Sequence, residues 1–202
     1  MTTRRRTRRR APDDKRRRIL DAARELFRAK GAGKVTTSQI AKKAGVSEGI
    51  IFHHFGSKRG VLAEVAGAYG HGVATRMFEG ILPGQRPDVE GMVRRTCEYV
   101  ADHGKLHDML TMTEDPADWN AAIMASREII IAALTQAFVQ WRAAGYIETE
   151  HPAIAASLLY GLVESALTDC YVRGHEDRVE DYIAECVACI EGALGYEGPD
   201  PA

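Results

Sequence analysis

The chain has 202 residues, enough for one large or two small domains, and its 45% hydrophobic content is ordinary for a globular protein with a core. No apolar run approaches the roughly 20 residues that cross a bilayer, and no hydrophobic segment typical of a secretory signal follows the arginine-rich start, so a cytoplasmic location is expected. Charge is uneven, since residues 1–62 hold 18 Lys/Arg and 5 Asp/Glu and the remainder hold 9 and 23.

Residues 1–12 are predicted to be a disordered basic arm, because their arginines are accompanied by almost no apolar side chains. A positive segment beside an acidic body is typical of a module that meets a polyanion. Arg4, Arg5 and Arg6 are therefore candidate DNA contacts. They could enter the minor groove or, less specifically, raise the affinity for phosphates.

The first predicted helix begins near Asp13 and Asp14, which favour a helix start, and ends at about Lys30, before Gly31. Its apolar residues keep helical spacing, which predicts one buried face. That face consists of Ile19, Ala23, Leu26 and Phe27.

Two short helices joined by a sharp turn are predicted next. Thr36 followed by Gln39 is a capping box that starts a helix, and Gly45 suits the left-handed conformation that ends it. Ser47 is an N-cap candidate for a second helix in which Ile51 and Phe55, four residues apart, face inward. This pattern indicates a helix-turn-helix, whose second helix enters the major groove of DNA.

The motif Ile40-Ala41-x-x-Ala44-Gly45-Val46-Ser47-x-Gly49-x-Ile51-Phe52-x-His54-Phe55-x-x-Lys58-x-x-Val61-Leu62 resembles the DNA-binding domain of TetR-family transcriptional regulators, with a detailed match over about residues 13–65. Two departures are visible. Phe52 stands where the family usually has a tyrosine whose hydroxyl often reaches a phosphate, and Ala32 stands where an aromatic residue is common.

The resemblance implies which residues meet DNA. Four are expected to position the domain on phosphates: Thr37, Ser47, His54 and Lys58. Four others, together with their neighbour Phe52, are expected to face the bases: Ser38, Glu48, Gly49 and His53. Phosphate contacts fix the register on DNA, whereas contacts to base edges determine which sequence is read.

A fourth helix is predicted from about Lys58 toward Met77, and it would connect this domain to the rest of the chain. Gly67, Gly70 and Gly72 are expected to loosen it. The composition of residues 82–87 then indicates a break. The predicted division is a basic arm (1–12), a DNA-binding domain (13–60), a linking helix and break (61–85) and a helical domain (86–202).

The segment after the break is predicted to be helical throughout, with no strand alternation. We expect helices at about 88–103, 105–113, 117–144, 152–173 and 177–194, which gives an all-α, two-part protein. Residues 153–172 are apolar on nearly every side and need cover all round. The resemblance implies a homodimer through the last two long helices; a large monomeric core is the alternative.

Aromatic and methionine side chains are spread over the helices of residues 88–175 and could line an adaptable apolar pocket, although the same residues would equally make an ordinary core. Glu164 and Asp169 lie in the most apolar helix, where a carboxylate needs a partner, water or a polar group of a ligand. The candidate ligand-binding residues are Tyr99, Met109, Met112, Trp119, Phe138, Glu164 and Tyr171, with Met124 nearby.

Other chemistry has little support in the sequence. Cys186 and Cys189 lack a second ligand pair at metal spacing, and Gly104 breaks the helix between His103 and His107. No phosphate loop, dinucleotide fingerprint or nucleophile motif is present, so we expect no enzyme, cofactor or metal. The expected function is a ligand-responsive transcriptional repressor that binds operator DNA; a constitutive or architectural DNA-binding dimer is the alternative.

Overall fold

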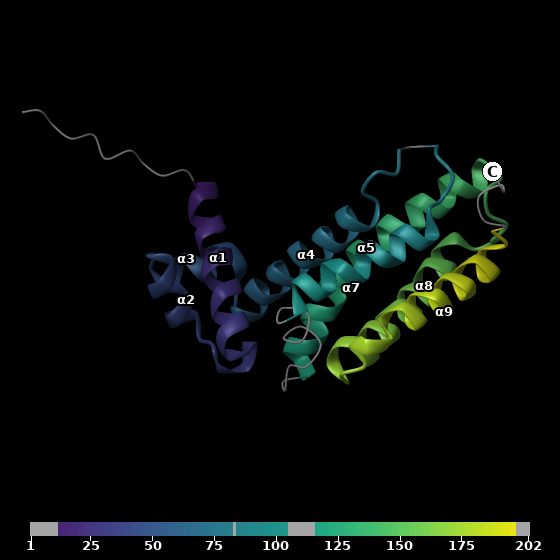
Figure 1. Ribbon diagram of the computed structural model, residues 1–202. Coiled ribbons are helices and arrows are strands. Elements are labelled where there is room, and N and C mark those ends of the chain that lie inside the picture. The colour runs from purple at the N-terminus through teal and green to yellow at the C-terminus, as the bar shows by residue number, and fades with distance from the viewer. Residues whose placement is uncertain (1–11, 83, 105–115, 197–202) are drawn as a thin grey trace, which may run out of the picture.

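The computed structural model describes residues 12–82, 84–104 and 116–196, and over these residues the chain is helical with no β-strand (Figure 1). The all-α prediction is confirmed. The predicted short helix near 105–113 lies outside the described residues, as do the basic arm with Arg4, Arg5 and Arg6 and the candidates Met109 and Met112.

The first helices form a small domain that we call the head. It consists of α1 (Pro12–Lys30), a 3-10 turn η1 (Ala32–Lys34), α2 (Thr37–Ala44) and α3 (Glu48–Phe55). These helices meet around a closed apolar core with fully buried side chains. The core includes Ile19, Ala23, Phe27, Ile40 and Ile51.

Local signals set the turn of the head, as the sequence predicts. The Thr36 hydroxyl accepts a hydrogen bond from the Gln39 amide, and the Gln39 side chain accepts one from the Thr36 amide, both at 3.2 Å. Gly45 ends α2 at φ 63°, which a residue with a Cβ rarely adopts. The Arg18 guanidinium donates to the carbonyls of Ala44 and Gly45, so it satisfies acceptors that the end of a helix leaves free.

Helix α4 (Lys58–Met77) leaves the head and runs along α7 (Pro116–Ala143), with which it makes its most extensive contacts (Figure 1). A Cβ at Gly70 would lie 2.7 Å from the Ser126 carbonyl oxygen, and one at Gly72 would collide with the Tyr99 hydroxyl. The prediction that these glycines loosen the helix was therefore wrong. Their missing side chains let α4 approach α7 and Tyr99 closely.

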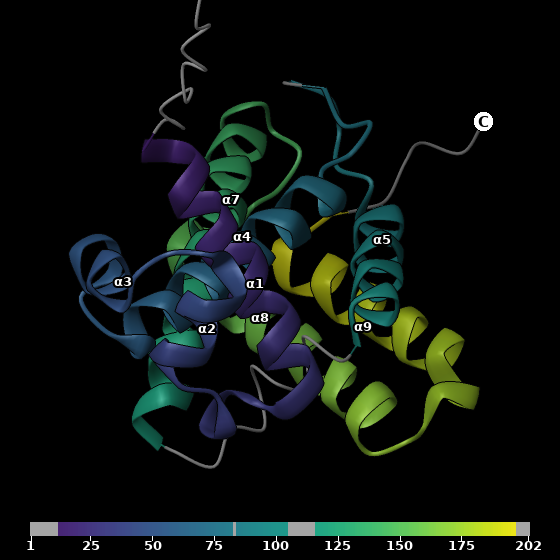
Figure 2. The ribbon, with the colours of Figure 1, turned by 90° about the vertical axis from the view of Figure 1, so that its left-hand side faces the viewer.

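The remaining helices form the body. These are α5 (Val89–Asp102), α8 (Pro152–Leu167) extended by a π-helical turn η2 (Thr168–Val172), a 3-10 turn η3 (Glu176–Arg178) and α9 (Val179–Leu194). Helices α8 and α9 lie side by side and form a layer against α5 and α7 (Figures 1 and 2). Pro152 starts α8, where its missing N–H costs nothing.

The break after α4 is fastened to the body by side-chain hydrogen bonds to its backbone carbonyls. Trp141 donates to Gln85 at 3.1 Å, Tyr146 to Gly84 at 3.2 Å, and Tyr196 to Pro87 at 2.7 Å. These bonds join α7 and the end of the chain to the start of α5. The body is thus tied together at the end far from the head.

The last helices leave an apolar face uncovered within this chain. Ile154 and Leu158 of α8 are 58% and 69% exposed, so the described residues of one chain do not supply the cover on every side that the composition of this helix requires. By length and composition alone, α7 and the segment Pro152–Val172 would also pass as membrane spans, which corrects the expectation that no apolar segment approaches that length. Both helices nevertheless pack against neighbouring helices of the body.

Candidate DNA-reading surface and effector cavity

The outer face of α3 is open, as a DNA-reading helix requires. Ile51 is fully buried in the core of the head, whereas Glu48, Gly49 and His53 are exposed and Phe52 is 51% exposed. Figures 1 and 2 show α3 on the outer side of the head. The structure therefore places the predicted base-facing residues of α3 together on one accessible face.

The other predicted DNA contacts flank this face. Ser38 and Ser47 are exposed, while Thr37 and His54 are half-buried. The Thr37 hydroxyl donates to the Glu48 carboxylate, which ties the first turn of α2 to the first turn of α3. This contact fixes the Glu48 side chain before any DNA is bound.

Lys58 is engaged inside the protein rather than extended toward solvent. Its ammonium donates to the Ala32 carbonyl at 3.1 Å and forms an ion pair with Asp118 of α7 at 3.2 Å. Arg59 Nε contacts the other Asp118 oxygen, also at 3.2 Å. The predicted phosphate contact of Lys58 would require this ammonium to leave Asp118.

Asp118 is a residue that sequence reasoning missed. It is 3% exposed and joins the start of α7 to the start of α4, where the head ends. An acidic residue in the first turn of a helix is common because it suits the helix dipole, so nothing in the sequence distinguished it. Its partners are about 60 residues away along the chain.

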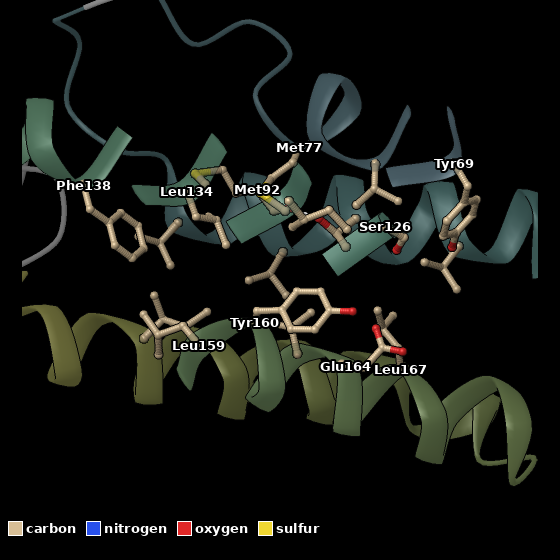
Figure 3. A pocket seen from close by; sticks show the side chains of 18 of the residues that line it. Tyr69, Met77, Met92, Ser126, Leu134, Phe138, Leu159, Tyr160, Glu164 and Leu167 are labelled. Carbon is tan, nitrogen blue, oxygen red and sulfur yellow. Dashed lines mark hydrogen bonds between the residues drawn. The ribbon is translucent and has the colours of Figure 1, made fainter. Parts of the chain in front are cut away.

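The body contains a cavity of about 950 Å³, including the open space at its mouth. Helices α4, α5, α7, α8 and α9 all contribute to its wall. One end is apolar and is lined by Phe138, Leu134 and Leu159 (Figure 3). Such a partly open, mainly apolar space with a few polar groups is typical of sites for small molecules.

The other end of the cavity is polar. Figure 3 shows Tyr160 and Glu164 of α8 directed to this end, opposite Ser126 of α7 and beside Tyr69 of α4. Burial raises the pKa of Glu164, and its interaction with Tyr160, four residues earlier on α8, offsets part of that effect.

Phe138 and Glu164 are the predicted ligand-binding residues that line this cavity. Tyr99 and Tyr171 lie outside its lining, which corrects the prediction for those two. The Tyr99 ring stacks on His103 at a centroid distance of 4.1 Å, and the Tyr171 hydroxyl donates to the Cys97 carbonyl at 3.3 Å. The Trp119 side chain is outside the described residues.

Sequence reasoning also missed part of the wall. The pocket was expected among residues 88–175, yet Tyr69, Val73 and Met77 of α4 line it, as do Ile190 and Leu194 of α9. Their helical spacing indicated burial but could not show that they surround an open space. Helix α4 is thus a wall of the cavity as well as the continuation of the head.

The cysteines and histidines form no metal site in the part of the chain that the structure describes. Cys186 is buried and Cys189 is exposed, so the two sulfurs do not share one environment. Burial raises the pKa of the Cys97 thiol to about 12, which keeps it protonated and unreactive at neutral pH.

Comparison with known proteins agrees with the geometry of the head. Residues 19–65 match the model of the bacterial regulatory proteins of the tetR family. Residues 19–65 are therefore a DNA-binding domain of the tetR-family type. A 56-residue segment is 46% identical to the HTH-type transcriptional regulator SrpR of Pseudomonas putida. This segment covers 28% of the present chain and 26% of SrpR, so the relative bears on the DNA-binding domain.

Solved TetR-family structures share the fold over nearly the whole chain. A transcriptional regulator from Syntrophomonas wolfei superposes with a TM-score of 0.72 at 14% identity, covering 95% of the present chain and 100% of its own. SmeT, the repressor of a Stenotrophomonas maltophilia multidrug efflux pump, was solved with triclosan and gives a TM-score of 0.67 at 18% identity, covering 93% and 98% of the two chains. The body therefore has the fold seen in these structures.

Proposed function

We propose that this TetR-family protein is a sequence-specific DNA-binding transcriptional regulator, a cytoplasmic repressor that a small, mainly apolar molecule releases from its operator. The observation that carries the proposal is that α4 both follows the reading helix and lines the cavity. The helix starts at Lys58, directly after the reading helix, and its residues Tyr69, Val73 and Met77 line the cavity. A molecule in the cavity therefore touches the element that continues into the head.

On DNA, the exposed face of α3 would lie in the major groove, with Glu48, Gly49 and His53 at base edges. Ser47, Thr37 and His54 would contact phosphates beside it. Phe52 offers an apolar ring where the family usually has a hydroxyl, and a thymine methyl is the matching base feature. The basic arm would add affinity that depends strongly on salt.

The proposed assembly is a homodimer through α8 and α9. The exposed side chains of Ile154 and Leu158 form an apolar face that a second copy would cover. Ala184, Ala188 and Gly192 are also exposed on α9, and their small size would let two helices approach closely. A two-fold dimer of this kind presents two reading helices to two half-sites about one helical turn apart.

Regulation would arise from the contacts that hold α4 against α7. At Gly70 the two backbones are so close that no side chain fits between them, and Ser126 of that contact lines the polar end of the cavity. A ligand that occupies this end must either fit the existing spacing or shift α4. A shifted α4 would move the head and change the distance between the two reading helices. That SmeT holds triclosan supports the idea that this fold accommodates an apolar effector.

The test begins with selection of bound sequences from random DNA, followed by a thermal-shift screen of apolar compounds for binding to the protein. The best compound is then titrated into the free dimer and into the dimer saturated with the selected DNA. We expect it to bind the DNA complex about 5- to 150-fold more weakly, and linkage requires the same factor for its effect on DNA affinity.

Two outcomes would contradict parts of the proposal. Equal affinity for free and DNA-bound protein would show that the compound is no inducer, and it would favour a constitutive DNA-binding dimer. Failure to enrich any sequence during selection would contradict specific DNA reading. A variant with Val73→Trp, which places a large ring in the cavity wall, is the matched control because it should block the compound and leave selection unchanged.

A further inference from the structure

The carboxylate of Glu164 stands out at the polar end of the cavity. It lines the cavity together with Tyr160, which lies four residues earlier on the same helix. Within the described residues, no lysine, arginine or histidine forms an ion pair with it. The buried Asp118, by contrast, is held by two cations.

This arrangement is costly without a ligand. Glu164 is half-buried in a mainly apolar wall, and a carboxylate with reduced access to water loses part of its hydration. Replacing such a group by a neutral one is often neutral or stabilising for a fold. A carboxylate kept in this position therefore points to a partner that arrives from outside the chain.

A guanidinium close to Tyr160 is already used elsewhere. Arg127 lies over the Tyr160 ring at 5.8 Å from its centroid and donates to the Ser157 hydroxyl at 2.7 Å. Tyr160 and Glu164 both line the cavity, whereas Arg127 is not among its lining residues (Figure 3).

We propose that the effector is an apolar molecule carrying a protonated amine, with the ammonium bound by Glu164 at the polar end. This assignment rests on the proposed function, because it takes the cavity as the effector site. The Tyr160 hydroxyl and Ser126 supply further polar groups at this end. The apolar part of the molecule extends toward Leu134 and Phe138.

The carboxylate in the cavity wall favours a positively charged ligand over an anionic or a neutral one. An anionic ligand would meet a carboxylate of the same sign in a poorly hydrated space. A neutral ligand would leave that carboxylate without a cation, and it would gain only an ordinary hydrogen bond. An ammonium gains a charge-assisted hydrogen bond, which is about twice as strong as a neutral one.

The test uses molecules that share one apolar body and differ in one group. The first set is 1-aminoadamantane, 1-adamantanol and 1-adamantanecarboxylate; the second is 4-phenylbenzylamine and 4-biphenylmethanol. Isothermal titration of each into the full-length protein should show that at least one amine binds roughly ten- to hundredfold more tightly than its alcohol. The carboxylate should bind most weakly.

The variant Glu164→Gln keeps the shape and removes the charge, and it should abolish the preference for the amine. The matched control Glu128→Gln removes the same charge from an exposed position on α7 and should leave the preference intact. Amines that bind no better than their alcohols, or a preference that survives Glu164→Gln, would overturn the proposal.

A second readout separates a ligand-binding role from a structural one. In the ligand-free protein, Glu164→Gln should leave the melting temperature unchanged or raise it, because a half-buried charge that forms no ion pair within the described residues has been removed. A clear fall would show that Glu164 holds the fold together, which contradicts the proposal. Selection of DNA sequences does not depend on Glu164. If the native protein shows no preference for amines but still selects a DNA sequence, the amine assignment is contradicted and the proposed function is not.

Discussion

The head and the body bury their apolar residues to a similar degree but use them differently. Phe27 of the head is fully buried in a closed core, and Phe138 of the body is 2% exposed, yet its ring borders a cavity of about 950 Å³. In the proposed function, the head has to hold α3 rigidly, whereas the body has to leave space for a ligand. Exclusion from water therefore does not show whether a side chain is packed on all sides.

The largest expected difference comes from truncating the two phenylalanines. Phe27→Ala should lower the free energy of unfolding by about 3–5 kcal/mol, since the ring is fully buried in the core of the head. Phe138→Ala should cost clearly less, because one side of its ring lacks contacts that could be lost. Urea unfolding followed by circular dichroism measures both. Equal losses would show that the cavity wall is packed like the core of the head.

Enlarging a buried side chain, rather than truncating it, also tests whether the head and the cavity wall are packed differently. Ala23 in the head and Ala122 in the cavity wall are both fully buried alanines on long helices. Ala23→Leu should destabilise by about 1–3 kcal/mol through overpacking. Ala122→Leu should be close to neutral, because its added atoms can enter the cavity, and it should weaken binding of the amine probes. A comparable loss of stability in both variants would mean that Ala122 faces packed neighbours.

The two regions also differ in how far the sequence predicted them. Thr36, Gln39 and Gly45 act through neighbours a few residues away, so the turn of the head could be predicted from its motif. Gly70 acts through Ser126, more than 50 residues away, and spacing along one helix could not reveal that contact. Helical periodicity placed most elements of the body correctly because it depends only on which residues are apolar.

The same physical reason explains why the sequence identified only some of the side chains that line the cavity. Tyr99 and Tyr171 have the chemistry of pocket residues, but whether a ring faces a cavity depends on the angle between packed helices. In the structure, Tyr99 turns to His103 and Tyr171 to the Cys97 carbonyl. Glu164 was a candidate because a carboxylate in an apolar helix needs a partner, and that argument does not depend on helix angles.

On the reading surface, the prediction concerns sequence preference. His53→Ala should reduce discrimination at one base pair by about 1–3 kcal/mol while changing affinity for random duplexes little, because His53 is exposed on the outer face of α3. Glu48→Ala should act similarly and also release the Thr37 hydroxyl. Binding to the selected site and to its single-base variants, measured by fluorescence anisotropy, checks both. Equal losses on specific and random DNA would remove His53 from the base-reading residues.

The smallest expected effect tests the connection between head and body at Asp118. Its ion pairs with Lys58 and Arg59 hold two cations that would otherwise be free to meet phosphates. Asp118→Asn should therefore strengthen binding to all DNA sequences severalfold and add up to about 0.9 to the slope of log affinity against log salt for each new phosphate contact. Stability should fall by roughly 1 kcal/mol, since both cations remain partly in water.

The double variant Lys58→Ala with Asp118→Asn decides how this gain arises. If the released Lys58 ammonium contacts a phosphate, removing it must cancel the part of the gain that Lys58 supplies, and the two substitutions will not be additive. If Lys58 serves only to hold Asp118 and the Ala32 carbonyl, Lys58→Ala will lower stability, and the affinity gained through Asp118→Asn will persist in the double variant. In the first case, binding of DNA competes directly with the contact that fastens α7 to the head. Occupation of the cavity, whose wall includes α7, would then be coupled to the phosphate contact through a single side chain.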